Sequence, residues 1–187
     1  MQERLKLKKL LLFFTLLSTL YGEAKIYVGA NVAYQYEIFT TTKKKAFNTT
    51  QNVNLKIGYG DINAYAVEFS VDYAKNDSNI VSPNDGDKYG FNVELLKAFN
   101  FDLFFNPFVK VGIGAGSMDV ERSLQTSVTY GSFNFGGGVF IPINEHVDIE
   151  IGYLYKTITY EKFNLLDELQ DISSDQQNSY LGVNFRF

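Results

Sequence analysis

Ten charged side chains recur at alternate positions along the chain, where they could support ion pairing or proton transfer. They are Glu37, Lys56, Glu68, Asp72, Glu94, Lys110, Asp148, Glu150, Lys156 and Arg186. A charge withdrawn from water needs an opposite charge beside it, because the cost of desolvation is otherwise uncompensated. The set therefore predicts either a structural network of ion pairs or a charged path that conducts ions, and both alternatives stay open.

Catalysis needs a different arrangement, in which a nucleophile lies beside a general base. His146 is the only histidine and follows Pro142-Ile143-Asn144-Glu145 without an obvious partner. We therefore expect a solvated turn residue and no catalytic residue. The chain has no cysteine, which excludes disulfides and thiolate metal sites. Gly112-x-Gly114-x-Gly116 has the wrong spacing for a dinucleotide fingerprint, so no cofactor and no metal are expected.

The first 24 residues are predicted to be a cleaved signal peptide. Basic residues at positions 4, 6, 8 and 9 precede an apolar run over 10–20, and Gly22-Glu23-Ala24 offers small residues to a signal peptidase. The run is short for a spanning helix, so an N-terminal membrane anchor is the lesser alternative. Cleavage after Ala24 leaves residues 25–187 as one domain with 13 basic and 19 acidic residues. This net charge of −6 argues against nucleic-acid binding.

Eight segments of the remaining chain alternate between apolar and polar or small residues, which is the period of a β-strand. They cover 26–38, 52–59, 65–73, 89–95, 107–116, 133–141, 147–156 and 180–187. The ten charges lie on the polar face, together with Tyr27, Phe140 and Leu154. Antiparallel neighbours would then bring Glu94 beside Lys110 and Glu150 beside Arg186, in the half of the barrel near the chain ends.

The connections between these segments alternate in length. Short ones are expected at 60–63, 97–104 and 142–146, and long polar ones at 40–50, 75–87, 117–127 and 157–177. Short periplasmic turns and long extracellular loops are typical of transmembrane barrels. With an even number of strands, both termini are expected on the periplasmic side.

The terminal pattern Tyr180-x-Gly182-x-x-Phe185-x-Phe187 resembles the C-terminal signal of bacterial outer-membrane β-barrels. The stretch Asn106–Gly116 is also similar to strands of the small barrels of the OmpA-transmembrane-domain, OmpX and opacity-protein type. The resemblance implies an all-β, eight-stranded antiparallel up-and-down transmembrane barrel in the outer membrane. It also implies that Tyr180, Gly182, Phe185 and Phe187 form an assembly signal for the barrel-assembly machinery, with outer-membrane lipid and lipopolysaccharide as further partners.

Alternation alone does not separate this barrel from a soluble one of the lipocalin kind, whose apolar face points inward. The polar face here is rich in Gly, Ala, Ser and Asn, which suit a narrow lumen better than a soluble exterior. We therefore expect a non-enzymatic barrel that stabilises the membrane and displays loops for surface interaction or adhesion. A narrow ion-conducting pore is the alternative, and a lipid A-modifying enzyme is disfavoured by the position of His146.

The long connections contain the candidate binding segments. Lys43-Lys44-Lys45 could meet lipopolysaccharide phosphates or be a solvated loop, and Asn84-Asp85-Gly86-Asp87 is expected to be a polar turn rather than a cation site. Between 157 and 177 an apolar group could form an amphipathic helix or a hairpin extension, which either binds a host or surface ligand or packs on other loops. This group consists of Phe163, Leu165, Leu166, Leu169 and Ile172.

Overall fold

The computed structural model describes residues 24–41, 45–61, 64–76, 85–120, 126–165 and 168–187. The expected signal peptide therefore lies outside the described residues, apart from its last residue, Ala24. The described chain begins its first strand at Lys25. Among the described residues there is no helix that is long and apolar enough to cross a membrane.

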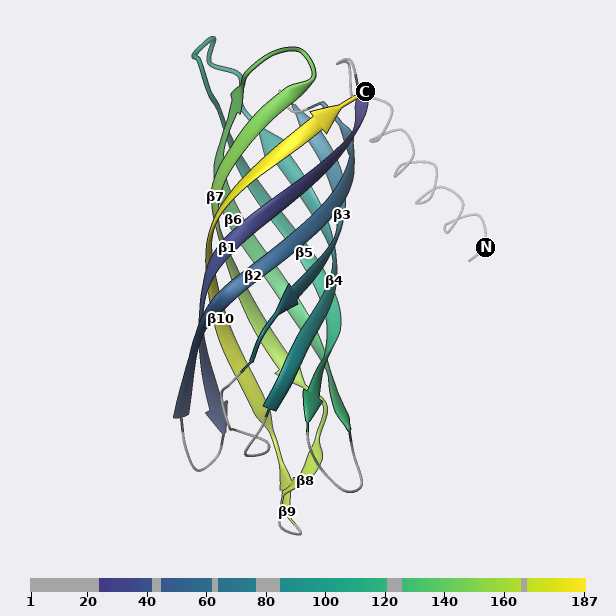
Figure 1. Ribbon diagram of the computed structural model, residues 1–187, viewed down its shortest axis with the longest axis vertical. Helices are drawn as coiled ribbons and strands as arrows, with labels where there is room; N and C mark the ends of the chain where they lie inside the picture. Colours follow the sequence, from purple (N-terminus) through teal and green to yellow (C-terminus); the bar gives the residue numbers. More distant parts are fainter. Residues whose placement is uncertain (1–23, 42–44, 62–63, 77–84, 121–125, 166–167) are drawn as a thin grey trace, which may run out of the picture.

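Eight long strands close into one antiparallel barrel (Figure 1). They are β1 (Lys25–Thr41), β2 (Lys45–Gly60), β3 (Tyr65–Ala74), β4 (Asp85–Ala98), β5 (Asn106–Val120), β6 (Ser127–Pro142), β7 (Val147–Tyr160) and β10 (Ile172–Arg186). Each strand pairs with its neighbour along the chain, and β1 pairs with β10 to close the ring. The eight-stranded up-and-down architecture expected from the alternation is confirmed.

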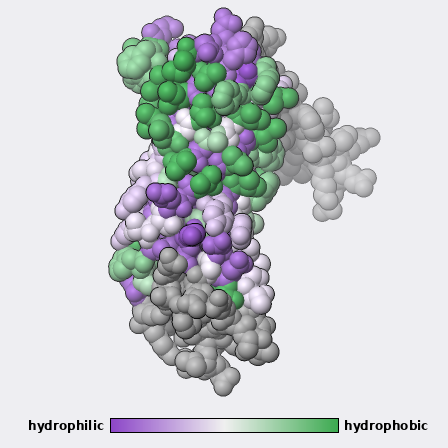
Figure 2. Space-filling view, viewed as in Figure 1, coloured by the Kyte–Doolittle hydropathy of each residue, from purple (hydrophilic) through white to green (hydrophobic). Residues whose placement is uncertain are grey.

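The apolar face of each strand points outward. Val32, Leu55 and Ile113 are 57%, 56% and 65% exposed, whereas Tyr27 and Phe140 on the opposite face are fully buried. Hydrophobic side chains gather over the half of the barrel nearer the C-terminus (Figure 2). An exterior of this kind excludes the lipocalin-type alternative, in which the apolar face fills the interior.

The strands continue past this apolar band, and there the pattern of polarity inverts on β5, β7 and β10, whereas β1 and β2 keep Ile38 and Phe47 on their outward faces. Polar side chains face outward on this part of β5, β7 and β10, namely Ser117, Asp119, Thr157, Thr159, Ser173, Asp175, Gln177 and Ser179. The interior contains an apolar cluster of Phe39, Met118, Val120, Val128, Tyr130, Ile158, Tyr160 and Ile172, beside buried polar groups such as Glu37, Lys88 and Gln176. This part of the barrel, here called the outer extension, therefore resembles a soluble barrel on β5, β7 and β10, with polar residues outside and an apolar cluster inside.

The outer extension corrects the expected long loops. The segment 40–50 is strand except at 42–44, which lie outside the described residues, and β5 and β7 run on to Val120 and Tyr160. Asp85-Gly86-Asp87 begins β4 rather than forming a turn, Asn84 lies outside the described residues, and Lys45 begins β2. The expected strand ends were wrong because strands were identified by apolar residues on the outward face. Beyond the apolar band, only the alternation of inward and outward side chains continues.

The segment after β7 forms a hairpin, which was one of the two expected alternatives. β8 (Phe163–Leu165) pairs with β9 (Glu168–Gln170) and projects from the end of the barrel opposite to the C-terminus (Figure 1). Ile172 does not belong to this hairpin, because it is buried inside the outer extension at 2% exposure. Leu166 lies outside the described residues.

Candidate functional site: the charged lumen

The centre of the lumen is a network of two lysines and three glutamates. Lys56 Nζ lies 2.9 Å from Glu68 Oε1 and also pairs with Glu150. Lys110 Nζ lies 3.2 Å from Glu94, 3.5 Å from Glu68 and 3.9 Å from Glu150. All five side chains are buried, so the mutual attraction of opposite charges reduces the cost of their desolvation.

Neutral donors complete this central network. Tyr27 and Tyr180 each donate a hydroxyl hydrogen bond of 2.8 Å, to Glu68 and Glu150 respectively. Asn184 Nδ2 donates to Glu150 Oε2 at 3.1 Å, and Asn134 Nδ2 donates to Glu94 Oε1 at 3.3 Å. Hydrogen bonds to charged groups stabilise them more than neutral pairs do, so these glutamates are held in place on several sides.

A second ion pair crosses the barrel. Lys156 Nζ on β7 lies 2.7 Å from Asp72 Oδ1 on β3, and these strands are opposite one another in the ring. Asn92 accepts from Lys156 at 3.1 Å and donates to Asp72 at 2.7 Å. The lumen is therefore narrow enough for one lysine to span it, as expected when eight strands enclose an interior that side chains can fill.

A third ion pair lies in the outer extension and includes Lys88, a residue that the sequence analysis missed. Lys88 Nζ lies 2.7 Å from Glu37 Oε1 and 2.8 Å from the Tyr160 hydroxyl oxygen. Its ammonium group also lies 4.9 Å from the centre of the Tyr130 ring and 5.4 Å from that of Tyr160, within the range of a cation–π contact. Lys88 shares the parity of Asn92 and Glu94 on β4, so continued alternation would have found it.

The fourth ion pair lies at the rim near the C-terminus and corrects one expected pairing. Arg186 lies 2.6 Å from Asp148 Oδ1 rather than beside Glu150. In the register of β10 with β7, Asn184 faces Asp148 and Gly182 faces Glu150. Arg186 is therefore two residues along the strand from the partner of Asp148 but four from the partner of Glu150. Glu150 is instead reached from across the lumen by Lys56 of β2. The expected Glu94–Lys110 pair is present.

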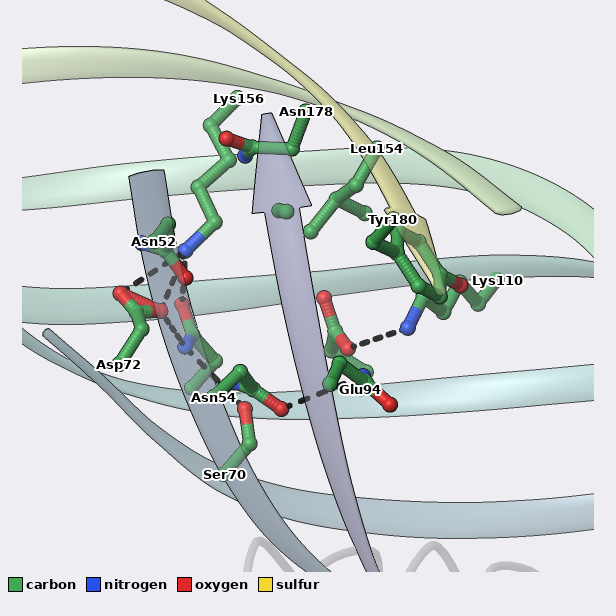
Figure 3. A pocket seen from close by; sticks show the side chains of 13 residues that line it. Asn52, Asn54, Ser70, Asp72, Glu94, Lys110, Leu154, Lys156, Asn178 and Tyr180 are labelled. Atoms are coloured by element: carbon green, nitrogen blue, oxygen red, sulfur yellow. Dashed lines mark hydrogen bonds and ion pairs between the residues drawn. The ribbon is translucent and has the colours of Figure 1, made fainter. Parts of the chain in front are cut away.

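Between the central network and the Lys156–Asp72 pair lies a small polar cavity (Figure 3). Its volume is about 30 Å³, and Asn31, Asn54 and Asn178 are among the side chains that line it. Asn31 Oδ1 is buried without a hydrogen-bond partner. A cavity of this size and polarity can hold a water molecule, but it is far smaller than a channel through the barrel.

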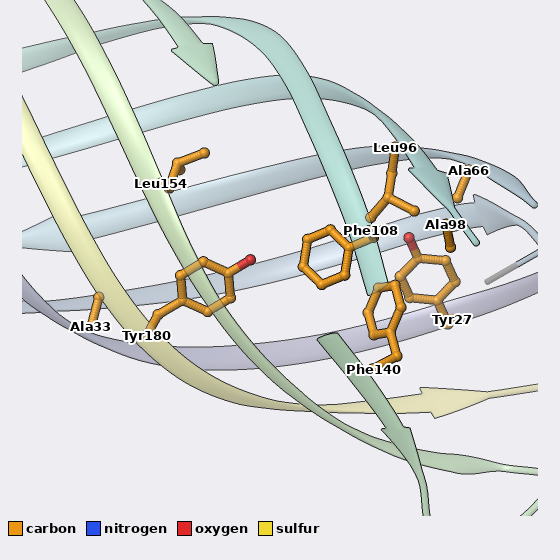
Figure 4. Close-up of a cluster of buried hydrophobic side chains, with 9 residues drawn as sticks. All are labelled: Tyr27, Ala33, Ala66, Leu96, Ala98, Phe108, Phe140, Leu154 and Tyr180. Atoms are coloured by element: carbon orange, nitrogen blue, oxygen red, sulfur yellow. The ribbon is translucent and has the colours of Figure 1, made fainter. Parts of the chain in front are cut away.

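Aromatic layers lie on both sides of the charged centre. Towards the C-terminal rim, the Phe108 and Phe140 rings stack at 4.5 Å beside Tyr27 and Leu96 (Figure 4). In the outer extension, Tyr130 and Tyr160 pack at 5.5 Å within the apolar cluster described above. The lumen is therefore filled by alternating aromatic and ion-paired layers.

The other candidate residues are placed as follows. Tyr180 and Gly182 lie on the inward face of β10, whereas Phe185 and Phe187 are 47% and 75% exposed. Their role as an assembly signal stays a prediction. His146 is exposed in the turn between β6 and β7. In the described part of the chain, no group of three His, Cys, Asp or Glu side chains is positioned to hold a metal ion.

Comparison with known proteins gives a consistent set of matches. The family model described as outer membrane protein beta-barrel domain matches residues 10–187. Neisserial surface protein A (NspA) aligns at 18% identity and a TM-score of 0.60, over 89% of this chain and 100% of that chain. No curated protein matches the chain.

Two further solved structures have the same fold. Ail, the attachment invasion locus protein of Yersinia pestis, aligns at 17% identity with a TM-score of 0.51, over 86% of this chain and 98% of that one. OprG from Pseudomonas aeruginosa aligns at 12% identity with a TM-score of 0.53, over 88% of this chain and 95% of that chain. At these identities the likeness is one of fold.

Proposed function

The chain belongs to the outer membrane protein β-barrel family, and from this premise we propose that it is a non-enzymatic barrel of the bacterial outer membrane that displays its outer extension for surface interaction or adhesion. The observation that carries the proposal is the inversion of polarity along β5, β7 and β10. Outward residues of β10 change from Leu181 and Phe185 near the rim to Asp175 and Gln177 farther along. Strands with polar outward faces that enclose an apolar cluster are stable in water, so they can hold the connecting segments away from the membrane.

The same layout supports a proposed orientation. The short turns and both ends of the described chain lie at the rim of the apolar band, whereas the β8–β9 hairpin lies at the far end of the outer extension. We assign the rim to the periplasm and the extension to the cell surface, with the signal peptide removed after Ala24. The barrel-assembly machinery would read Tyr180, Gly182, Phe185 and Phe187.

Two structural relatives support surface interaction as the class of function. One is described as an attachment invasion locus protein, and its structure is also known in complex with the heparin analogue sucrose octasulfate. The other is described as a surface protein. We propose a surface ligand for this chain too, recognised by the hairpin and the neighbouring connections, and lipopolysaccharide as a lateral partner of the outer extension.

An epitope tag tests the orientation. Inserted between β8 and β9, the tag should be labelled by antibody on intact cells, whereas the same tag after Asn144 should be labelled only after the outer membrane is permeabilised. The opposite labelling pattern would exclude the proposed display. Adhesion of cells that express the tagged barrel, compared with cells that carry an empty vector, then measures surface interaction.

A narrow pore is the second candidate, because the polar cavity beside Asn31 and Lys110 lies on the barrel axis. Conductance in planar bilayers separates it from the proposed role, since a lumen filled by ion pairs and aromatic layers should not pass a steady current. A lipid A-modifying enzyme would need its reactive groups near lipid, whereas His146 lies in a turn at the rim that we assign to the periplasm. A change in lipid A mass on overexpression would contradict the non-enzymatic role.

A further inference from the structure

The turn between β4 and β5 is apolar, although turns that face water are usually built from Gly, Pro, Asn, Asp and Ser. Its seven residues run from Phe99 to Phe105, and five of them are large hydrophobic residues. Phe101, Leu103 and Phe104 are 61%, 54% and 77% exposed. In the turn between β6 and β7 at the same rim, Ile143 is followed by three polar residues. The exposed aromatic residues of this turn therefore have no counterpart in the β6–β7 turn.

This surface is continuous with the lipid-facing side of the barrel. Phe99 prolongs the outward column of β4 that contains Leu95, and Phe105 prolongs the outward column of β5 that contains Val109. The Phe99 N–H donates to the Pro107 carbonyl at 2.8 Å, which keeps the two columns side by side beyond the end of the regular ladder. The turn thus extends an existing membrane contact rather than starting a separate patch.

The rings of the turn are held in defined pairs. Phe99 and Phe101 stack with centroids 6.2 Å apart, and Phe104 meets Phe105 edge-on at 4.9 Å. The backbone N–H of Asp102 donates to Asn100 Oδ1 at 2.8 Å. This bond satisfies polar groups within the turn itself, so the turn can approach an apolar phase at reduced cost.

A cation lies just inside the aromatic group. Lys97 Nζ is 3.9 Å from the centre of the Tyr65 ring and 5.7 Å from that of Phe99. Aromatic rings beside lysine are the usual composition of a protein surface at the level of lipid headgroups. From this position the Lys97 ammonium group can extend to the lipid phosphates.

The β4–β5 turn lies across the barrel from a second group of exposed apolar residues, so the two groups together could hold the barrel at a fixed depth and tilt. β4 and β5 lie opposite β1 and β10, where Ile26 and Phe187 are exposed at 52% and 75% on the same rim. Apolar groups on two opposite sides of one rim resist both tilting and vertical displacement of the barrel.

We propose that the Phe99–Phe105 turn is an interfacial anchor that inserts Phe101, Leu103 and Phe104 among phospholipid headgroups and fixes the depth of the barrel. The occupant of this surface is lipid, because the surface continues the lipid-facing columns and is flanked by Lys97. The inference holds for either leaflet, so it does not depend on the proposed orientation.

The chain contains no tryptophan, so a single introduced tryptophan reports its own depth. Phe101→Trp and Phe104→Trp are reconstituted separately in phosphatidylcholine vesicles, with Glu145→Trp in the other turn as the matched control. The retained shift in gel mobility of unheated samples verifies that each variant is folded. Depth is read from the emission maximum, from quenching by aqueous acrylamide and from quenching by lipids brominated high on the acyl chain.

Both anchor positions should emit at shorter wavelength than the control, lose fluorescence with brominated lipid and resist acrylamide. The control should show the reverse on all three readouts. If Trp at positions 101 and 104 is as accessible to acrylamide as Trp at 145 and is not quenched by brominated lipid, the turn projects into water and the anchor is excluded. A protein partner would then be the alternative occupant.

Discussion

At the scale of single residues, the lumen is organised by side chains that cross it. Lys156 reaches Asp72 on the opposite strand, and Lys56 reaches Glu150 past two intervening strands. Such contacts cannot be predicted from strand pairing, because the pairing of adjacent strands does not determine which side chains meet from opposite sides of the barrel. Sequence alternation therefore placed the ten charges inside but assigned Arg186 the wrong partner.

Removing Lys156 should destabilise the barrel strongly. Lys156→Ala leaves the buried Asp72 carboxylate without its cation, at a cost of about 3–5 kcal/mol for a truly buried pair. Lys162→Ala is the matched control, because the Lys162–Asp171 pair is 67% and 75% exposed and exposed pairs contribute only about 0–1 kcal/mol. Urea unfolding in detergent micelles measures both variants. Equal midpoints for Lys156→Ala and Lys162→Ala would show that the lumen is hydrated and that the pair adds little.

Phe187→Asp tests the proposed assembly signal. Phe187 is exposed and its N–H donates to the Ile26 carbonyl at 2.9 Å, a backbone bond that the substitution preserves. Folded yield in cells should fall because the aromatic ending is lost, whereas refolding of the purified chain in micelles should be unchanged. Ile143→Asp, an exposed turn position on the same rim, is the control. A normal yield of folded Phe187→Asp barrel in the outer membrane would count against the signal.

At the scale of strands, period-two alternation predicted all eight barrel strands but underestimated their length. The apolar outward face ends at residues such as Tyr155, whereas β7 continues through Thr157, Ile158 and Tyr160 with its polarity exchanged. A strand that leaves lipid for water no longer needs an apolar outward face, so one hydrophobicity rule cannot identify the whole strand. Lys88 was missed for a different reason: it shares the inward parity of Asn92 and Glu94 but lies just before the expected start of the segment at 89.

The β8–β9 hairpin is the element that we expect to bind a surface ligand. Replacing Leu165, Leu166 and Leu169 with Ser should leave assembly intact, because β7 and β10 remain paired below the hairpin. Binding to host cells or partner proteins should be reduced. Heat-modifiable gel mobility measures assembly, and a cell-adhesion assay measures binding. Unchanged adhesion with intact assembly would remove this hairpin from the proposed binding surface.

At the scale of the whole molecule, the interior of the barrel is filled by packed and ion-paired side chains. The Phe108–Phe140 layer, the central ion-pair network, the Lys156–Asp72 pair and the Tyr130–Tyr160 layer follow one another along the axis. Each layer contains side chains from several strands, so packing of the lumen and closure of the ring stabilise each other. This arrangement suits a rigid support for surface segments better than a conduit.

Conductance in planar bilayers tests this view of the molecule. The wild-type barrel should conduct weakly or not at all, because the cavity of about 30 Å³ is enclosed by charged and aromatic layers. Lys110→Ala removes a cation shared by Glu68, Glu94 and Glu150, so water should enter the centre and raise the current. The rise should be small and intermittent, since the aromatic layers remain. Arg186→Ala, which loosens the rim, should act in the same direction, whereas the exposed variant Lys162→Ala should leave the current at the wild-type value. A large steady wild-type current, unchanged by Lys110→Ala and Arg186→Ala, would overturn the filled lumen and favour the pore.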